Sequence, residues 1–253
     1  MIARRILPLA VLLTAACVSA WGQTTLPTVI VSGLPTIGVA ATQPTATVSL
    51  SAAYPLNVTV TMALTFTPTG GSAHAFDAKF AIGGTTTTFV LSPAVSTASV
   101  PVMIGTVAGI ITITTNAMDS AGNSLTPVPV TNVMTVNATV PVITKVTFGT
   151  FGSGTFSISV TGRSTPRDMS SALFHFALPT NTQPSTLDVT VPLTTAFTAW
   201  YGSSSSTTFG STFTATVQFS YTGPPGSTVP FTAVTVTMTN SVGASNAFGP
   251  VNP

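Results

Sequence analysis

Short runs in which apolar residues alternate with Thr or Ser fill the chain from Thr24 onward. Residues 45–51 (TATVSLS) and 57–67 (NVTVTMALTFT) show this alternation most clearly. A period of two residues is that of a strand with one buried and one exposed face. Clusters of Gly, Pro, Asn and Ser, as at 68–71 and 121–124, separate the runs and predict tight turns. The pattern therefore predicts an all-β fold.

The same alternation predicts further strands in two series. They cover residues 76–82, 85–91, 98–104 and 109–115 in the first series, and residues 142–148, 155–161, 172–178, 187–191, 212–221 and 229–239 in the second. A boundary near residue 139 gives each half about 110 residues, the ordinary size of one immunoglobulin-like sandwich. The sequence thus predicts two tandem antiparallel β-sandwiches, at residues 23–139 and 140–253, without an obvious internal repeat.

The first 22 residues have the organisation of a secretory signal peptide. Arg4 and Arg5 precede an apolar stretch at 6–16, and small residues at 18–20 offer a cleavage site, with a second one after Gly22. The apolar stretch is too short to span a bilayer, and no later stretch approaches the ~18 apolar residues of a membrane helix. We expect export to the cell surface or the medium, with no transmembrane segment in the mature chain.

Lipid attachment at Cys17 is the competing interpretation of this segment. The bacterial lipoprotein motif prefers Leu three residues before the cysteine, and Thr14 stands there instead, which disfavours attachment. Cys17 is the single cysteine, so cleavage leaves a mature chain without disulfides, a thiolate nucleophile or a cysteine-based metal site.

Cleavage also changes the charge balance. Only 4% of the residues are charged, against about 25% in ordinary globular domains. The charged residues after position 22 are Lys79, Lys145, Arg163, Arg167, Asp77, Asp119, Asp168 and Asp188. They sum to zero, so the sequence pI of about 9.0 comes largely from the leader. The mature chain offers no basic surface for nucleic acid or anionic lipid.

One segment departs from the period of two. Phe197, Trp200 and Tyr201 stand at helical spacing within residues 193–202 (LTTAFTAWYG), with Thr194 or Thr195 available as an N-cap. We expect a short helix that ends at Gly202, lies across one end or edge of the second sandwich and turns its aromatic side chains inward.

Several segments resemble immunoglobulin-like β-sandwich modules of secreted and cell-surface bacterial proteins. They are residues 105–115 (GTVAGIITITT), 162–176 (GRSTPRDMSSALFHF), 197–213 (FTAWYGSSSSTTFGSTF) and 234–245 (VTVTMTNSVGAS). The resemblance implies a spacer, an adhesive stalk or a binding domain, and it transfers no catalytic residues and no cofactor.

Residues for acid–base, nucleophilic or metal chemistry are scarce. His175 lies between Phe174 and Phe176, so alternation predicts a solvent-facing strand histidine. His74 and Asp77 (HAFD) make a weak metal signal, because a structural zinc site needs four ligands and a catalytic site three. No Gly-x-Ser-x-Gly elbow, phosphate loop or dinucleotide motif is present. We therefore predict no catalytic residues, no metal and no cofactor.

Five residues are candidates for ligand binding. Arg163, Arg167 and Asp168 concentrate charge in one short stretch, where they form either an ion pair that fixes a loop or a contact with an anion or carbohydrate. Trp200 and Tyr201 would stack on a sugar if exposed and would anchor the core if buried.

These observations predict a non-enzymatic structural or adhesive module of the bacterial cell surface. The alternative is a carbohydrate-binding module that uses the five candidate residues. Cell-surface polysaccharide and other surface proteins are the candidate partners, and sheet edges with few charges also favour self-association.

Overall fold

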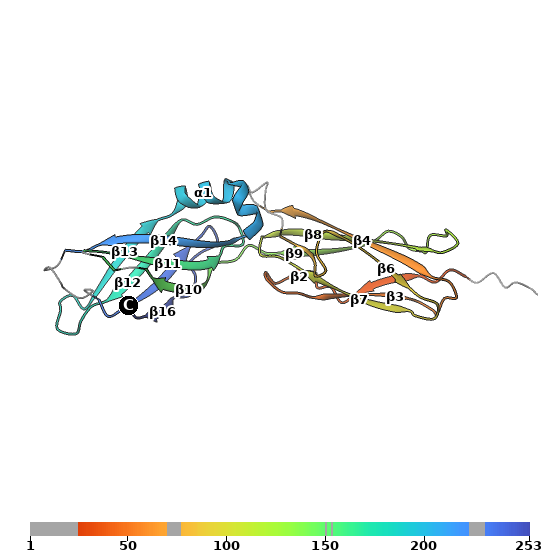
Figure 1. Cartoon of the computed structure of the whole chain (residues 1–253), viewed down its shortest axis with the longest axis horizontal. Coiled ribbons are helices and arrows are strands. Elements are labelled where there is room, and N and C mark those ends of the chain that lie inside the picture. Colours follow the sequence, from red (N-terminus) through yellow and green to blue (C-terminus); the bar gives the residue numbers. More distant parts are fainter. Residues whose placement is uncertain (1–24, 70–76, 150, 153, 223–230) are drawn as a thin grey trace, which may run out of the picture.

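The computed structural model describes residues 25–69, 77–149, 151–152, 154–222 and 231–253. The predicted signal peptide at 1–22 and His74 lie outside these residues. Two β-sandwiches follow one another along the long axis of the molecule (Figure 1). Residues 137–141 connect them, since the last strand of the first sandwich ends at Val136 and the next strand begins at Val142.

The first sandwich has one sheet of order β1-β3-β7-β5 and a second of order β2-β9-β8-β4-β6. Its strands are β1 (Val29–Ser32), β2 (Ile37–Gly38), β3 (Thr45–Leu50), β4 (Val58–Pro68), β5 (Lys79–Phe80), β6 (Thr86–Leu91), β7 (Thr97–Met103), β8 (Gly109–Asp119) and β9 (Val130–Val136). All pairs are antiparallel except β2 with β9. The long strands β4 and β8 pair over their full length and form the centre of the larger sheet.

The second sandwich has sheets of order β10-β11-β14 and β13-β12-β15-β16. Its elements are β10 (Val142–Phe148), β11 (Thr155–Arg163), β12 (Ser171–Ala177), β13 (Thr186–Pro192), α1 (Thr194–Gly202), the 3-10 helix η1 (Ser204–Phe209), β14 (Thr212–Ser220), β15 (Ala233–Thr239) and β16 (Phe248–Val251). Helices α1 and η1 join an edge strand of one sheet to an edge strand of the other. Among the described residues no helix is long and apolar enough to cross a bilayer.

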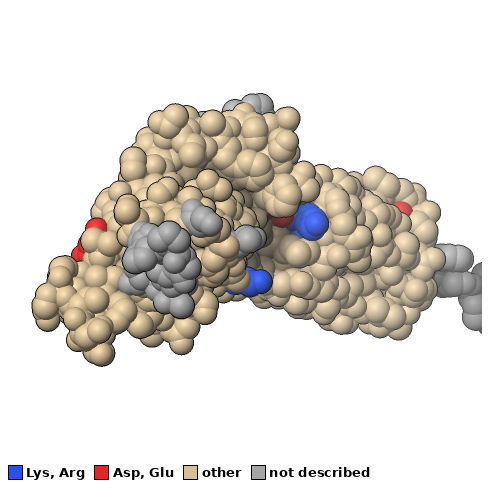
Figure 2. Space-filling model, turned by 60° about the vertical axis from the view of Figure 1, so that its left-hand side comes forward, with Lys and Arg blue, Asp and Glu red and all other residues tan. Residues whose placement is uncertain are grey.

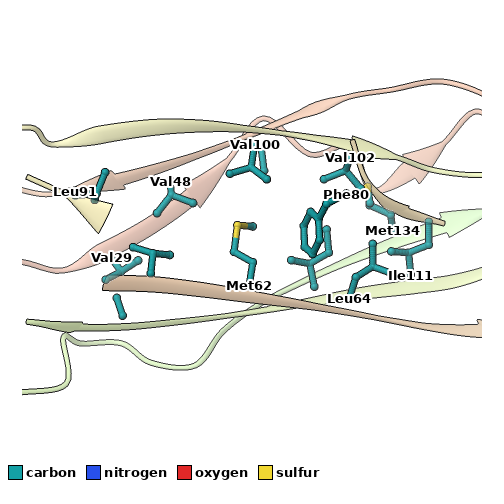
Figure 3. Close-up of a cluster of buried hydrophobic side chains, with 14 of the residues drawn as sticks. Val29, Val48, Met62, Leu64, Phe80, Leu91, Val100, Val102, Ile111 and Met134 are labelled. Atoms are coloured by element: carbon teal, nitrogen blue, oxygen red, sulfur yellow. The ribbon is translucent and has the colours of Figure 1, made fainter. Parts of the chain in front are cut away.

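Each sandwich has its own apolar core, built by the alternation that the sequence shows. In the first, Met62 and Leu64 of β4 and Ile111 of β8 point between the sheets, and Leu64 and Ile111 lie beside Phe80 and Met134 (Figure 3). The second core is aromatic, with Phe156 and Phe231 rings 5.0 Å apart and further phenylalanines around them. Burial of these side chains is the main source of stability in a chain without disulfides.

The predicted class, an all-β chain of antiparallel sandwiches, is confirmed. The predicted strands are present within a few residues, although the one expected at 76–82 is only the two-residue β5 within its described part. Four strands were not predicted: β1, β2, β9 and β16. Two of these, β1 and β16, have only four residues each. Strand β16 also contains Gly249 and Pro250, residue types that are disfavoured inside strands and indicate turns.

A buried carboxylate closes the turn after β8. Asp119 is 4% exposed, and its Oδ1 accepts the N–H groups of Ala121 and Asn123 at 2.9 and 2.8 Å. Its Oδ2 accepts from the Tyr54 hydroxyl at 2.8 Å and from the Asn123 side-chain amide at 3.0 Å. These hydrogen bonds lower the pKa of Asp119 to about 2, and the one from the Asn123 side chain has the largest effect. The hydrogen bond to this carboxylate in turn raises the pKa of Tyr54.

Asp119→Asn should lower the free energy of unfolding of the first sandwich by about 2 kcal/mol, because an amide leaves buried donors unsatisfied. The pKa of Asp119 falls from its ordinary 3.8 to about 2 on folding, so the stabilisation is complete above about pH 4 and is lost as the pH falls toward 2. Urea unfolding from pH 6 to pH 2 measures both effects. Asp188→Asn, at a 61% exposed side chain, is the control. Equal decreases in the free energy of unfolding for Asp119→Asn and Asp188→Asn would contradict the stabilising role of Asp119.

Candidate functional site

The two sandwiches meet at a joint built from backbone and small polar side chains. The loop between β7 and β8 enters it, with Val107 and Ala108 buried. The N–H of Ala108 donates to the carbonyl oxygen of Thr165 at 2.8 Å. Ser211 donates twice to Thr106, from its N–H to Oγ1 at 2.8 Å and from its Oγ to the carbonyl oxygen at 2.7 Å. Direct hydrogen bonds therefore join loops from both sandwiches.

Asp77 lies at the centre of this joint. Its Oδ2 accepts the N–H of Thr106 at 2.6 Å and the Thr106 hydroxyl at 2.5 Å. A Cβ atom at Gly105 or at Gly210 would overlap the carboxylate, and both glycines have a positive φ, +82° and +60°. Glycine is thus required on both sides, and the carboxylate is enclosed between the sandwiches.

The segment that connects the sandwiches is also held in place. Thr139 donates its N–H to the Oγ1 of Thr165 at 2.7 Å. The side-chain amide of Asn240 donates to the Thr139 carbonyl oxygen at 2.8 Å and to the Ser164 hydroxyl at 3.0 Å. The connection is therefore fixed against two loops of the second sandwich.

Arg167 is 4% exposed and organises the second sandwich where it meets the first. Its Nη1 donates to the Gly210 carbonyl oxygen at 2.7 Å, and its Nη2 donates to the Tyr201 carbonyl oxygen at 2.6 Å and to Ser206 Oγ at 2.8 Å. Burial lowers the pKa of Arg167, while the nearby Tyr201 and Asp77 oppose this shift. A guanidinium nevertheless stays protonated in proteins.

Tyr201 completes this arrangement. Its ring lies 4.8 Å below the Arg167 guanidinium carbon, and its hydroxyl donates to the Ser211 carbonyl oxygen at 2.7 Å. The residue is 3% exposed, and burial raises its pKa. Tyr201 is therefore a buried core residue and is not exposed for stacking on a sugar.

The other charged candidates lie apart from the guanidinium of Arg167. Asp168 is half-buried, and its Oδ1 accepts the N–H of Ser241 at 3.3 Å. Arg163 is half-buried at the end of β11, beside Thr212. Of the two alternatives for this stretch, the Arg–Asp ion pair is wrong within the described residues: carbonyl and hydroxyl oxygens accept from both Nη atoms of Arg167, and its buried Nε has no hydrogen-bond partner there.

The histidine and metal expectations have different outcomes. His175 faces solvent as predicted, with 46% of its side chain exposed and its Nδ1 2.5 Å from Asp188 Oδ1. Asp77 faces the joint, and its predicted partner His74 lies outside the described residues. In the described part of the chain no three His, Cys, Asp or Glu residues are grouped as metal ligands.

The predicted helix is present as α1, and it buries Phe197 and Tyr201. The predicted threonine cap is wrong. Leu193 occupies the N-cap position without a side-chain bond, and the Thr194 hydroxyl donates to Ser170 instead, at 3.4 Å. At the other end Ser203 donates to the Trp200 carbonyl oxygen from both its N–H and its hydroxyl.

An apolar groove of about 660 Å³ runs between α1 and β14. We call it the α1–β14 groove; its lining residues are Thr161, Leu193, Ala196, Phe197, Trp200, Phe209, Thr212, Phe213, Thr214, Ala215, Thr216 and Val217. The ring centroids of Trp200 and the 54% exposed Phe209 are 5.7 Å apart. The indole N–H of Trp200 is buried and has no hydrogen-bond partner among the described residues.

Only part of this site follows from the sequence. Two of the five candidate residues, Arg167 and Tyr201, are brought together, although they contact each other and the protein backbone. Thr106 and Ser211 were not singled out, because a bridging threonine looks like any other in a Thr-rich chain. The sequence holds no signal for them, because Gly105 and Gly210 come together around Asp77 only in the fold.

No protein-family model and no curated protein matches the chain. Among solved structures it is similar to the FN1–FN3 domains of chicken CNTN1, with 12% identity and a TM-score of 0.27, over 90% of this chain and 67% of that one. So loose a superposition supports no inference about function. The sheets described above define the class, an all-β chain of immunoglobulin-like sandwiches.

Arg167→Lys should lower the free energy of unfolding of the second sandwich by about 3 kcal/mol, because an ammonium cannot reproduce the planar fork that reaches three acceptors. The matched control is Arg163→Lys, since the Arg163 side chain makes no hydrogen bond within the described residues; its cost should stay below about 1 kcal/mol. Urea titration followed by near-ultraviolet circular dichroism compares them. The same urea midpoint for Arg167→Lys and Arg163→Lys would show that the hydrogen bonds of the Arg167 guanidinium do not stabilise the second sandwich.

Proposed function

We propose that the chain is a non-enzymatic structural or adhesive module of the bacterial cell surface, exported through the segment at 1–22. Two sandwiches, residues 23–139 and 140–253, set a fixed distance and orientation between whatever is joined to their ends. The observation that carries the proposal is the joint, in which Thr106 hydrogen-bonds both to Asp77 and to Ser211 of the other sandwich.

A fixed joint is not the ordinary case. Domains joined by a linker move relative to one another unless their contact is extensive or specific. Here the connection at 137–141 is short and bonded through Thr139, and the enclosed Asp77 leaves no space for a side chain at Gly210. Steric fit and direct hydrogen bonds together oppose hinge motion, as a spacer or stalk requires.

The described titratable groups support a structural role. Asp119 closes a turn, and Asp77 and Arg167 hold the joint and α1. The ion pair of His175 and Asp188 lies on the exposed face of β12 and β13. The surface itself carries few charges (Figure 2), so contacts with other surface molecules would be apolar and hydrogen-bonded rather than electrostatic.

Thr106→Val should loosen the joint, because valine keeps the shape but removes the hydroxyl that bonds Asp77 and Ser211. Spin labels at Val90→Cys on β6 and Leu187→Cys on β13, both exposed, report the distance between the sandwiches in a Cys17→Ser background. Double electron–electron resonance should give one narrow distance distribution for the parent and a broader one for the variant. The free energy of unfolding of Thr106→Val should be about 1 kcal/mol below that of the parent.

The control for this experiment is Thr61→Val, which removes a hydroxyl that pairs with Thr88 at 3.2 Å outside the joint. Its distance distribution should match the parent. A broad distribution in the parent itself would contradict the proposal of a rigid spacer.

The carbohydrate-binding alternative keeps one observation in its favour, the position of Trp200 on an open groove. Tyr201 and Arg167 are buried against protein partners, and of the five candidates only Trp200 lines the groove, so a sugar there would be held mainly by Trp200. We expect no retention in pull-downs with insoluble polysaccharides or on a glycan array. Retention that disappears in Trp200→Ala, with unchanged circular dichroism, would support the alternative instead.

A further inference from the structure

The α1–β14 groove follows the edge of a strand. Six consecutive residues of β14, from Thr212 to Val217, line it. Successive side chains of a strand point to opposite faces, so a cavity that touches all six includes the edge of the strand. The lining also contains Thr161 of β11, whose hydroxyl bonds that of Thr214, so the groove extends from this edge over the threonine face of the sheet. Strand β14 ends the order β10-β11-β14, and no strand of the described residues pairs with its other side. Its outward N–H and C=O groups therefore border the groove.

The opposite wall is apolar and uncharged. It consists of Leu193, Ala196, Phe197 and Trp200 at and within α1, with Phe209 of η1. None of the lining residues carries a charge, so a charged side chain placed here would lose water without gaining a partner. The unpaired indole N–H of Trp200 is a donor that a nearby carbonyl oxygen could satisfy.

The dimensions fit an extended peptide. Six strand residues span about 20 Å, at about 3.3 Å per residue. A volume of about 660 Å³ falls within the range of ligand sites, about 300–1,000 Å³. A groove between a helix and an unpaired strand edge is the geometry in which a peptide adds to a sheet through main-chain hydrogen bonds.

We propose that the α1–β14 groove binds an extended, uncharged segment of a partner polypeptide as a fourth strand of the β10-β11-β14 sheet. Main-chain groups of the segment pair with β14. Alternate side chains contact the aromatic wall of Phe197 and Trp200, and those between them lie beside Thr214 and Thr216. This site is separate from the joint, and a protein with a rigid joint that binds no peptide would overturn this inference alone.

The groove selects a free segment over a folded copy of the chain. A strand that enters it has β14 on one side and α1 on the other. An edge strand of a second copy, such as β6, already has a neighbour, β4, on its paired side. That neighbour would occupy the position of α1, so only a strand outside any sheet of its own can enter.

The test uses an acetylated, amidated peptide of alternating Thr and Val with Gly-Ser ends. Its control peptide has Pro at the central valine, which removes a main-chain donor and disfavours a strand. Hydrogen–deuterium exchange of the full chain should show saturable protection of residues 212–217 with the first peptide and none with the second. No protection by the first peptide, or equal protection by both, would overturn the proposal.

Matched variants assign the binding to the groove. Ala196 and Ala199 are both exposed residues of α1, and only Ala196 lines the groove. Ala196→Lys should weaken binding about tenfold or more, because it places a charge against the apolar wall, whereas Ala199→Lys should bind like the parent. Equal affinities would overturn the proposal, as would an oligosaccharide that protects α1 while the peptide protects nothing.

Discussion

Both the joint and the α1–β14 groove depend on the buried guanidinium of Arg167. One of its nitrogens holds the carbonyl oxygen of Gly210, beside the serine that bonds Thr106 across the joint. Another holds the carbonyl oxygen of Tyr201, in the helix that forms the groove wall. A buried cation is tolerated only when acceptors surround it. Satisfying this one charge therefore fixes α1, η1 and the start of β14 relative to one another.

The fold follows from the sequence because its signal is repeated and local. Every long strand alternates over its own length, as in β4 and β8, and each half contains enough apolar residues for a core. Helix α1 was predictable for the same reason, since Phe197 and Tyr201 are spaced to face one side. Strands β2 and β16 were not, because their partners β9 and β15 define them more than their own residues do.

The site is harder to derive because its residues come from distant parts of the chain. In the sequence Gly105 and Gly210 each indicate only a turn, and the fold alone brings both against the carboxylate of Asp77. Arg167 and Asp168 are adjacent and opposite in charge, which favours an ion pair from sequence alone. The fold places three fixed oxygens at the two Nη atoms of Arg167 instead, while the carboxylate of Asp168 accepts from the N–H of Ser241.

A sheet edge in a chain with so few charges carries a risk of pairing with other copies, because charged side chains are a common protection of such edges. Beside β14 lies the α1–β14 groove, and residues of α1 form its opposite wall. The wall of α1 excludes a strand that is already paired in a sheet of its own. The groove still has room for a short extended segment that is not paired. The same placement that protects the edge from folded neighbours thus gives it selectivity for an extended one.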